Sequence, residues 1–549
     1  MNSKTLAALG LSDFKTYILK YFLPIFLLDV LILLIFVLGF DNTYAKMLGY
    51  FVFVCVFVTL FAYPIMIIDA QTRDIEENLH FFITYAGALS TVNLERKELF
   101  TDLSEKKRYK EISNIFRKLI YLVETIKVDF ASAAYKVSSI LNTEHFARFL
   151  ERMGIALSFN ANIGSFLIGE QRVLMRAYEN VYVEGLERIR TIQDLFVSLV
   201  LAFSFALAIV LLLPFLTGVD SVIFLQFGLI TIVFLDMVLL VMVKFFLPAD
   251  KLYHDLGMEP GRVKCWMSFG FSAIIALFVS PFILLTDVPF MMKLAIIMTP
   301  FVFTGMYASY QEKKVKNRDV LFPAFIRSLG DVHQSKGGTL TTTIETLLPH
   351  NFGILDSMLE RLYKRLKITS DKFTSWFYFS KESGSALIAE FTDIFITVVY
   401  RGGSAAIAGE IVSDNMEKIN GLRDQKLEFA STLRGNVFGT FFGLALTIYI
   451  SQMVAVLLME VFTSLTSDLT GAALDLLAGI FPTSMETDSS GASMYIALIL
   501  LVHATISAYI VKDVDGGNKL AMFQDLVIML WIGAVLEFAI ISMSGSFFT

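Results

Sequence analysis

Few residues in this chain have the types and spacing that enzyme chemistry requires. The run Gly516-Gly517-Asn518-Lys519 sets glycines beside a lysine, but it lacks the Gly-x4-Gly-Lys-Ser/Thr spacing with which a backbone cradles phosphates. No Gly-x-Ser-x-Gly turn is present to expose a nucleophilic serine. The six histidines are scattered, without the His-Glu-x-x-His spacing of a zinc site: His80, His145, His254, His333, His350 and His503. We therefore expect no catalytic residue, no cofactor and no metal, and any nucleotide energy would have to come from a partner.

Four ionisable side chains lie well inside apolar segments: Asp29, Asp236, His503 and Glu537. An isolated charge at the centre of a bilayer costs roughly 2.5–3.5 kcal/mol, so each needs a partner or a change of protonation. One interpretation is a path for protons or ions. The other is hydrogen bonding between helices, or a carboxylic acid kept neutral, and we favour it because so few such groups are present.

Small residues recur every four positions at the start of one apolar segment: Gly435, Gly439, Gly443, Thr447 and Ser451. On a helix this spacing forms one narrow stripe, along which a second helix can approach closely in lipid. The stripe could be a homodimer seam or a sliding surface that transmits force. It could also be ordinary packing within the bundle.

Composition sets the class of protein that must position these groups. The chain has 549 residues, of which 56% are apolar, and its mean hydropathy is +0.66. Soluble domains are about 45–50% apolar, so the composition predicts a polytopic membrane protein of the all-α class. The two cysteines, Cys55 and Cys265, are far apart in or beside apolar segments, which argues against a disulfide or a zinc site.

About 20 apolar residues in a helix cross the hydrocarbon core of a bilayer. This rule predicts nine spans, separated in places by turns too short for anything but antiparallel neighbours. The spans are Ile18–Phe40, Met47–Ile68, Leu195–Leu216, Ser221–Leu247, Cys265–Thr286, Phe290–Tyr310, Val437–Glu460, Ala492–Val511 and Leu526–Met543.

The placement of basic residues predicts the orientation, because Lys and Arg concentrate on the cytoplasmic side. With the N-terminus inside, only Lys46 and Lys293 of the 45 Lys and Arg residues fall toward the outside. The external loop Val461–Gly491 has four acids and no base. Nine spans then put both large polar segments in the cytoplasm and the C-terminus outside.

The two polar segments, 69–194 and 311–436, have equal length and the same setting between spans. They divide the chain into a two-span segment (1–68), a first cytoplasmic domain, a four-span segment (195–310), a second domain and a three-span segment (437–549). Apolar residues at helical spacing, such as Ile112, Ile115, Phe116 and Leu119, predict helical bundles. Each domain ends in a helical pattern that runs into a span, from Glu170 and from Ala405 onward.

The second domain resembles the type II secretion F-domain family. The resemblance rests on Phe322–Gly330, followed by Gly337-Gly338-Thr339-Leu340 and a helix to Leu348. The corresponding stretch of the first domain, Leu89–Leu94, has no glycine pair, so its assignment rests on position and length. Members of this family form the membrane platforms of type II secretion systems, type IV pili and the archaeal flagellum (archaellum), and the chain's length and extra spans resemble the archaellum members.

The resemblance implies a non-catalytic role. A hexameric cytoplasmic secretion-type ATPase would dock on the two domains, pilin-like subunits would be added to a filament, and the platform could rotate it. Alternatives are the platform of an adhesive pilus or of a secretion system. A secondary transporter using the intramembrane carboxylates is the alternative from another class. Nucleic-acid binding is not expected, because acids nearly balance bases in both domains.

Two basic clusters on the matched domains are candidates for docking the ATPase: Lys106, Lys107, Arg108 and Lys110, and Arg361, Lys364, Arg365 and Lys367. An acidic face of the ATPase would be their partner. They could equally be solvated helix faces or contacts with anionic lipid headgroups.

Overall fold

The structure is a computed structural model. It describes residues 72–92, 94–217, 221–247, 250–257, 260–369, 371–467 and 489–546, together with Leu23, Phe26 and Val30. Every regular element in these ranges is a helix, so the predicted all-α class is confirmed. The spans predicted at Ile18–Phe40 and Met47–Ile68 lie outside the described ranges, apart from those three residues.

The described residues form two compact units. The first takes residues up to Tyr178 together with Ile394–Val412, and the second takes Glu179–Asp393 and the residues from Ser413 on. The boundaries of these units differ from the domain boundaries expected from the sequence, which remain a prediction.

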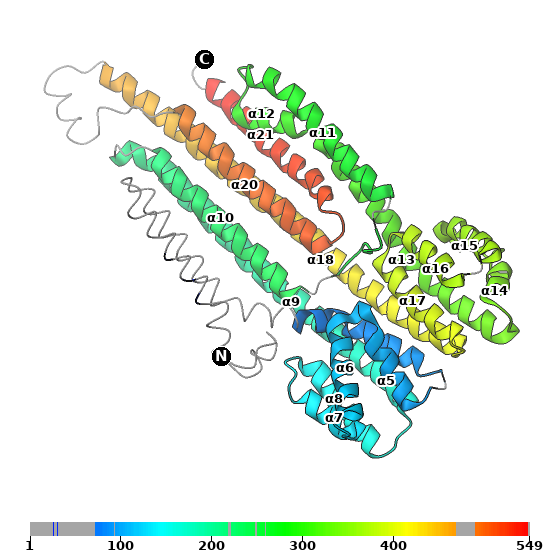
Figure 1. Cartoon of the computed structure of the whole chain (residues 1–549). Helices are drawn as coiled ribbons and strands as arrows, with labels where there is room; N and C mark the ends of the chain where they lie inside the picture. The colour runs from blue at the N-terminus through cyan, green and yellow to red at the C-terminus, as the bar shows by residue number, and fades with distance from the viewer. Residues whose placement is uncertain are drawn as a thin grey trace. The chain divides into compact units, whose positions relative to one another are not determined.

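The first unit is a small helical bundle (Figure 1). It contains a helix at 72–89, α5 (Arg96–Glu105), α6 (Lys110–Glu124), α7 (Phe130–Ser138), α8 (Glu144–Ser158) and the start of α9. α6 shows why the sequence folds this way, because Ile112, Ile115 and Phe116 are buried on one face while Lys110 is exposed on another. Buried aromatic rings form the centre of the bundle: Phe82, Phe100, Phe116, Phe146 and Phe149.

The turn at Arg401–Ser404 also belongs to the first unit. Arg401 pairs with Asp102, and the backbone N–H of Ser404 donates to Oγ1 of Thr91 at 3.2 Å. Gly403 packs so closely that an added Cβ would lie 2.9 Å from Thr91 Oγ1. A segment 300 positions along the chain therefore completes this bundle.

Two helices run without a break from polar sequence into apolar sequence. α9 spans Ile163–Thr217, 55 residues, and α18 spans Ala405–Ser467, 63 residues. The expected continuous helices are confirmed. At 1.5 Å per residue, α18 is about 95 Å long, so it reaches well beyond the roughly 30 Å of a bilayer core.

The second unit contains the other apolar helices: α10 (Ser221–Phe246), α11 (Pro260–Leu284), α12 (Phe290–Met298), α20 (Ser489–Asp515) and α21 (Met522–Ser546). Within it α10 and α20 lie side by side (Figure 1). Six described helices are long and apolar enough to cross a membrane, or seven if α12 and α13 (Phe301–Lys336) form one span. The chain is thus a multi-pass membrane protein.

The predicted span Phe290–Tyr310 is not one straight helix. α12 and α13 meet at a 45° bend, and Pro300 is the N-cap of α13. Proline has no N–H to continue the hydrogen-bond ladder, and its ring crowds the preceding turn. The sequence rule counted apolar residues and did not use this proline.

The second domain continues from α13 through α14 (Leu340–Leu347), α15 (Asp356–Ile368), α16 (Lys372–Ser383) and α17 (Ala386–Tyr400) into α18. The backbone conformation explains the glycine pair on which the sequence resemblance rests. Gly337 and Gly338 both have positive φ, +67° and +86°, which side chains disfavour. Thr339 then caps α14 with a reciprocal hydrogen bond to Thr342.

The order of helices repeats along the chain. The helix at 72–89 precedes α5, α6, α7, α8 and α9, and α13 precedes α14, α15, α16, α17 and α18. α5 begins at Arg96 and α14 at Leu340, 244 positions later, and α9 begins at Ile163 and α18 at Ala405, 242 later. α7 and α16 even share an aspartate cap, Asp129 and Asp371, each accepting from a backbone N–H three residues on.

Candidate functional site

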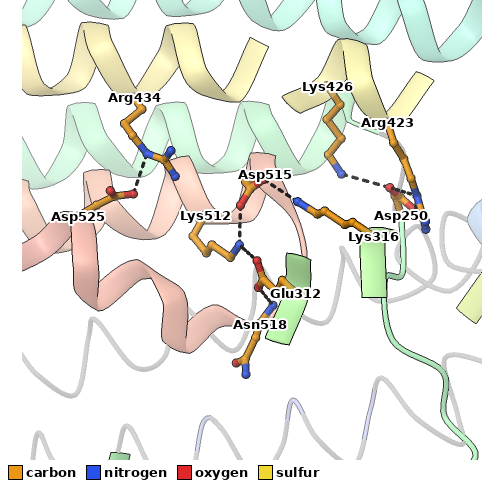
Figure 2. Close-up of polar contacts among 10 residues, drawn as sticks. All are labelled: Asp250, Glu312, Lys316, Arg423, Lys426, Arg434, Lys512, Asp515, Asn518 and Asp525. Atoms are coloured by element: carbon orange, nitrogen blue, oxygen red, sulfur yellow. Dashed lines mark hydrogen bonds and ion pairs between the residues drawn. The ribbon is translucent and has the colours of Figure 1, made fainter. Parts of the chain in front are cut away.

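A network of charged side chains lies in the second unit, where α13, α18, α20 and α21 change from apolar to polar sequence. Figure 2 shows its members converging from these helices and from the loop that contains Asp250. The members are Asp250, Glu312, Lys316, Arg423, Lys426, Arg434, Lys512, Asp515, Asn518 and Asp525, to which Asp319 is added by its contact with Arg423. We call this set the charge network.

Glu312 of α13 links that helix to the turn between α20 and α21. Its Oε2 accepts from Nζ of Lys512 at 2.7 Å, and its Oε1 accepts from the backbone N–H of Asn518 (Figure 2). Glu312 is 4% exposed and Lys512 is 3% exposed. Gly517 lies directly against this carboxylate. A Cβ added to Gly517 would be 2.5 Å from Oε1 of Glu312.

Asp515 connects the same two helices a second time. It accepts from Lys512 at 2.5 Å and from Lys316 of α13 at 3.1 Å. Helical spacing makes this possible, because Glu312 and Lys316 are four residues apart on one face of α13 and Lys512 and Asp515 are three apart on α20. Two adjacent side chains on each helix therefore meet in one contact.

Arg423 of α18 bridges two carboxylates. Its Nε and Nη2 donate to Asp250 at 3.0 and 2.6 Å, and its Nη1 donates to Asp319 of α13 at 2.8 Å. The planar fork of a guanidinium fits such a double contact, which a lysine cannot reproduce. Nζ of Lys426 lies 3.9 Å from Asp250, so a second cation also faces that carboxylate (Figure 2).

The two carboxylates on Arg423 have opposite pKa shifts. Burial alone would raise the pKa of Asp250, but the nearby charges of Arg423 and Lys426 outweigh it and hold that pKa at about 2. Asp319 lies nine residues past the apolar part of α13. Burial raises the pKa of Asp319 to about 6, although the positive charge of the shared Arg423 acts to lower it.

The raised pKa of Asp319 predicts a pH dependence. The protonated form fits the folded site better, so the stability that Asp319 contributes is present below its unfolded pKa of about 4 and is lost as the pH rises through about 6. An Asp319→Asn variant stays neutral throughout. We expect the unfolding free energy of the variant, measured relative to wild type, to rise by on the order of 2–3 kcal/mol between pH 4.5 and pH 8.

Thermal or denaturant unfolding of the two proteins at both pH values measures this difference. Asp424→Asn is the control, because Asp424 directly follows Arg423 on α18 and is exposed. A pH-independent difference between Asp319→Asn and wild type would show that Asp319 stays ionised in the folded chain.

The network connects neighbouring helices of the second unit. Nε of Arg434 on α18 donates to Asp525 of α21 at 3.0 Å, which adds a third link between helices. Buried ion pairs give little net stability over apolar packing, but losing one partner is costly because the other charge is left uncompensated. Among the described residues, no group of His, Cys, Asp or Glu side chains has the geometry of a metal site.

The predicted docking clusters have internal partners. Arg361 and Arg365 both pair with Glu382 of α16, Arg361 at 3.0 Å. Partial burial raises the pKa of Glu382, but these two guanidiniums lower it below its ordinary value. Lys367 lies over the Tyr363 ring, while Lys364 is exposed.

In the first cluster, Lys106 lies 4.8 Å from the centroid of the Tyr85 ring and 3.4 Å from Oγ1 of Thr397. Arg108 and Lys110 are exposed, and the side chain of Lys107 lies outside the described part. Contact of either cluster with an ATPase stays a prediction.

The structure brings two of the four intramembrane groups together. Nδ1 of His503 on α20 lies 3.0 Å from both carboxylate oxygens of Asp236 on α10, and both side chains are fully buried. This is a hydrogen bond between helices, the kind of contact that the favoured interpretation expected, although the sequence did not indicate which groups would pair. Glu537 accepts from the backbone N–H of Met291 at 3.1 Å, and Asp29 lies outside the described residues.

The stripe of small residues is partly open. An added Cβ at Gly435 or Gly439 would meet no atom within 4 Å, and one at Gly443 would meet Leu201 at 3.8 Å. The hydroxyl of Ser451 donates to the backbone oxygen of Thr447 at 2.8 Å. A homodimer seam along this stripe stays a prediction.

Sequence reasoning missed the charge network itself. In the sequence, basic residues at the ends of spans indicate orientation only, and Gly516-Gly517 lacks the spacing of a phosphate-binding loop. A usable signal was present, because charged residues cluster at the polar ends of several predicted spans, where bundled helices bring them to one level.

Comparison with known proteins identifies the family. No family model and no solved structure matches the chain. Flagella accessory protein J of Methanocaldococcus jannaschii is 31% identical over 542 residues, covering 95% of this chain and 94% of that protein. The protein of the same name from Methanococcus voltae is 28% identical over 534 residues, with the same coverage. At this identity over nearly the full length, the chain belongs to the flagella accessory protein J family, the FlaJ or ArlJ proteins of the archaellum.

Proposed function

We propose that this chain is a non-enzymatic membrane platform that couples a cytoplasmic secretion-type ATPase to assembly of the archaellum filament. Both helical domains and the N-terminus would lie in the cytoplasm and the C-terminus outside. The supporting observation is the single helix α18, which joins the second domain to a candidate span without interruption. A continuous helix can carry a displacement along its axis, whereas a flexible linker cannot.

The charge network supports a coupling role for α18. Arg423 links this helix to α13 and to the loop at Asp250, and Arg434 links it to α21. These links lie within about four helical turns before the apolar segment that begins at Val437. A displacement of the domain would therefore be passed to several spans together rather than to one.

The partners follow from the same proposal. The ATPase, a hexamer, would supply the free energy of nucleotide hydrolysis, and pilin-like subunits would be taken from the membrane into the filament. The exposed lysine and arginine residues of the two basic clusters are the candidates for ATPase contact. Rotation of the filament against the platform is compatible with this arrangement.

The proposal is tested with the full-length chain in nanodiscs and the purified cytoplasmic ATPase of the same gene cluster. We expect the two to copurify and the platform to stimulate ATP hydrolysis over empty nanodiscs. If a correctly folded chain shows no binding to the ATPase and no stimulation of ATP hydrolysis, the proposal is contradicted.

A break in α18 separates binding of the ATPase from transmission to the membrane. Glu428 is exposed on α18 between Arg423 and Arg434, so its replacement leaves the buried links in place. Glu428→Pro removes a hydrogen bond inside the helix and costs about 3 kcal/mol locally. We expect a strain with this variant to lose swimming motility in soft agar while the protein still binds the ATPase.

Glu428→Ala is the matched control, because it removes the same side chain and keeps the helix. That variant should swim like wild type. Equal motility of the two variants, at equal protein levels, would rule out α18 as the element that transmits force.

A further inference from the structure

A cavity of about 490 Å³ lies beside the charge network in the second unit. Its walls come from α13, α18, α20 and α21, at the level where each helix changes from apolar to polar sequence. Ligand sites commonly have volumes of roughly 300–1,000 Å³. The cavity is large enough for the headgroup of a phospholipid.

The lining has more positive charge than its carboxylates neutralise. Four cations, Lys313, Lys316, Arg434 and Lys512, face three carboxylates, Glu312, Asp515 and Asp525. Each carboxylate already has a partner: Lys512 contacts Glu312 and Asp515, Lys316 contacts Asp515, and Arg434 contacts Asp525.

Two basic side chains at the cavity have hydrogen-bond donors that these ion pairs do not use. Lys313 is exposed at the cavity and makes no ion pair within the described ranges. Arg434 uses its Nε on Asp525, and no contact in the described part engages its two terminal nitrogens. A guanidinium and an ammonium that face one cavity suit a phosphate group, which accepts hydrogen bonds from both.

Part of the cavity lining is apolar. Phe438 and Ile528 form this part, and Ile528 of α21 is 42% exposed on a helix with the length and composition of a span. A ligand with a negatively charged head and an apolar tail would match both the basic and the apolar part of the lining. Basic pockets between spans at the membrane boundary bind lipid headgroups by this combination.

We propose that this cavity binds a phosphate group, which an anionic membrane phospholipid or free inorganic phosphate could supply. The apolar wall favours the lipid. The bound headgroup would contact α13 through Lys313 and α18 through Arg434, and would thus connect the two helices at the charge network.

Native mass spectrometry of the full-length chain in detergent tests the proposal, with dioleoylphosphatidylglycerol and dioleoylphosphatidylcholine as the lipid probes. We expect one phosphatidylglycerol per chain to be retained in preference to phosphatidylcholine. Lys313→Gln should weaken its binding about fivefold, the effect of one basic residue near a headgroup. Adding Arg434→Lys, which keeps the charge for Asp525 but removes the fork, should weaken it further.

The matched control is Lys264→Gln, because Lys264 is exposed at the polar start of the apolar stretch of α11 and does not line the cavity. It should bind phosphatidylglycerol like wild type. Equal losses in Lys264→Gln and Lys313→Gln, or no preference for the anionic lipid together with no bound phosphate, would overturn the proposal. In the second arm the chain is incubated with sodium phosphate; phosphate retained by wild type but not by Lys313→Gln, without retained phosphatidylglycerol, would assign the site to free phosphate.

Discussion

Gly517→Ala is expected to destabilise the protein by about 3 kcal/mol more than Gly516→Ala, because it breaks a buried ion pair. The two glycines have nearly the same φ, +84° and +82°. An alanine at either position is therefore expected to have a similar strain from its positive φ, about 1 kcal/mol. The difference lies in the surroundings, because a Cβ at Gly517 would overlap Glu312 while one at Gly516 would lie 3.5 Å from Nζ of Lys426.

Glu312 cannot move aside cheaply. Its two oxygens are held by Lys512 and by the backbone N–H of Asn518, and its side chain is buried. To admit the new methyl group, the carboxylate must leave at least one of these partners. Thermal unfolding of the full-length chain in nanodiscs should show the larger loss for Gly517→Ala, and loss of motility should follow the same order.

A double-mutant cycle identifies the cause. In a Glu312→Ala background the overlapping carboxylate is gone, so Gly517→Ala should cost no more than Gly516→Ala. If both alanine variants lose the same stability in the wild-type background, or if the extra loss persists without Glu312, the close approach of Gly517 to Glu312 is not a constraint.

The helices could be predicted because their signals are local. An apolar run of about 20 residues, or apolar side chains three and four apart, is visible in a short window of sequence. These local patterns predicted α10, and they predicted that the helix from Ala405 continues into an apolar segment. Local signals also located the turn at Gly337-Gly338, since glycine tolerates the positive φ it requires.

The charge network could not be predicted from such windows, because its pairs join distant residues. Glu312 and Lys512 are 200 positions apart, and Asp250 and Arg423 are 173 apart. Any basic residue at the polar end of a span is equally consistent with a solvated side chain. Only the packing of α13 against the turn after α20 decides which carboxylate meets which ammonium.

The basic clusters show a related difficulty. Arg361 and Arg365 are four apart and were expected to share an exposed face. They do share a face, but it is turned toward Glu382 at the end of α16. Helical periodicity gives the face of a helix and leaves open which neighbour that face meets.

Arg423→Ala is the second substitution with a large expected effect, a loss of about 3–5 kcal/mol in unfolding free energy. Its guanidinium contacts Asp250 and Asp319 simultaneously, and the side chain of Asp319 is 2% exposed. Removing the arginine leaves the buried carboxylate of Asp319 without a cation, and leaves Asp250 with Lys426 alone at 3.9 Å. Arg423→Lys should be intermediate, because a single ammonium cannot bridge both carboxylates.

Two comparisons distinguish the loss of these buried ion pairs from the loss of any positive charge. Arg190 pairs with Glu187 at 3.2 Å on the exposed face of α9, where both side chains are more than half exposed, so Arg190→Ala should change stability by less than about 1 kcal/mol. Asp319→Asn should restore much of the stability lost in Arg423→Ala, since Asp250 keeps Lys426 as its cation and no buried carboxylate is then left without one. If Arg423→Ala is as mild as Arg190→Ala, or if neutralising Asp319 gives no recovery, then Arg423 stabilises α18 through its packing and not through its ion pairs.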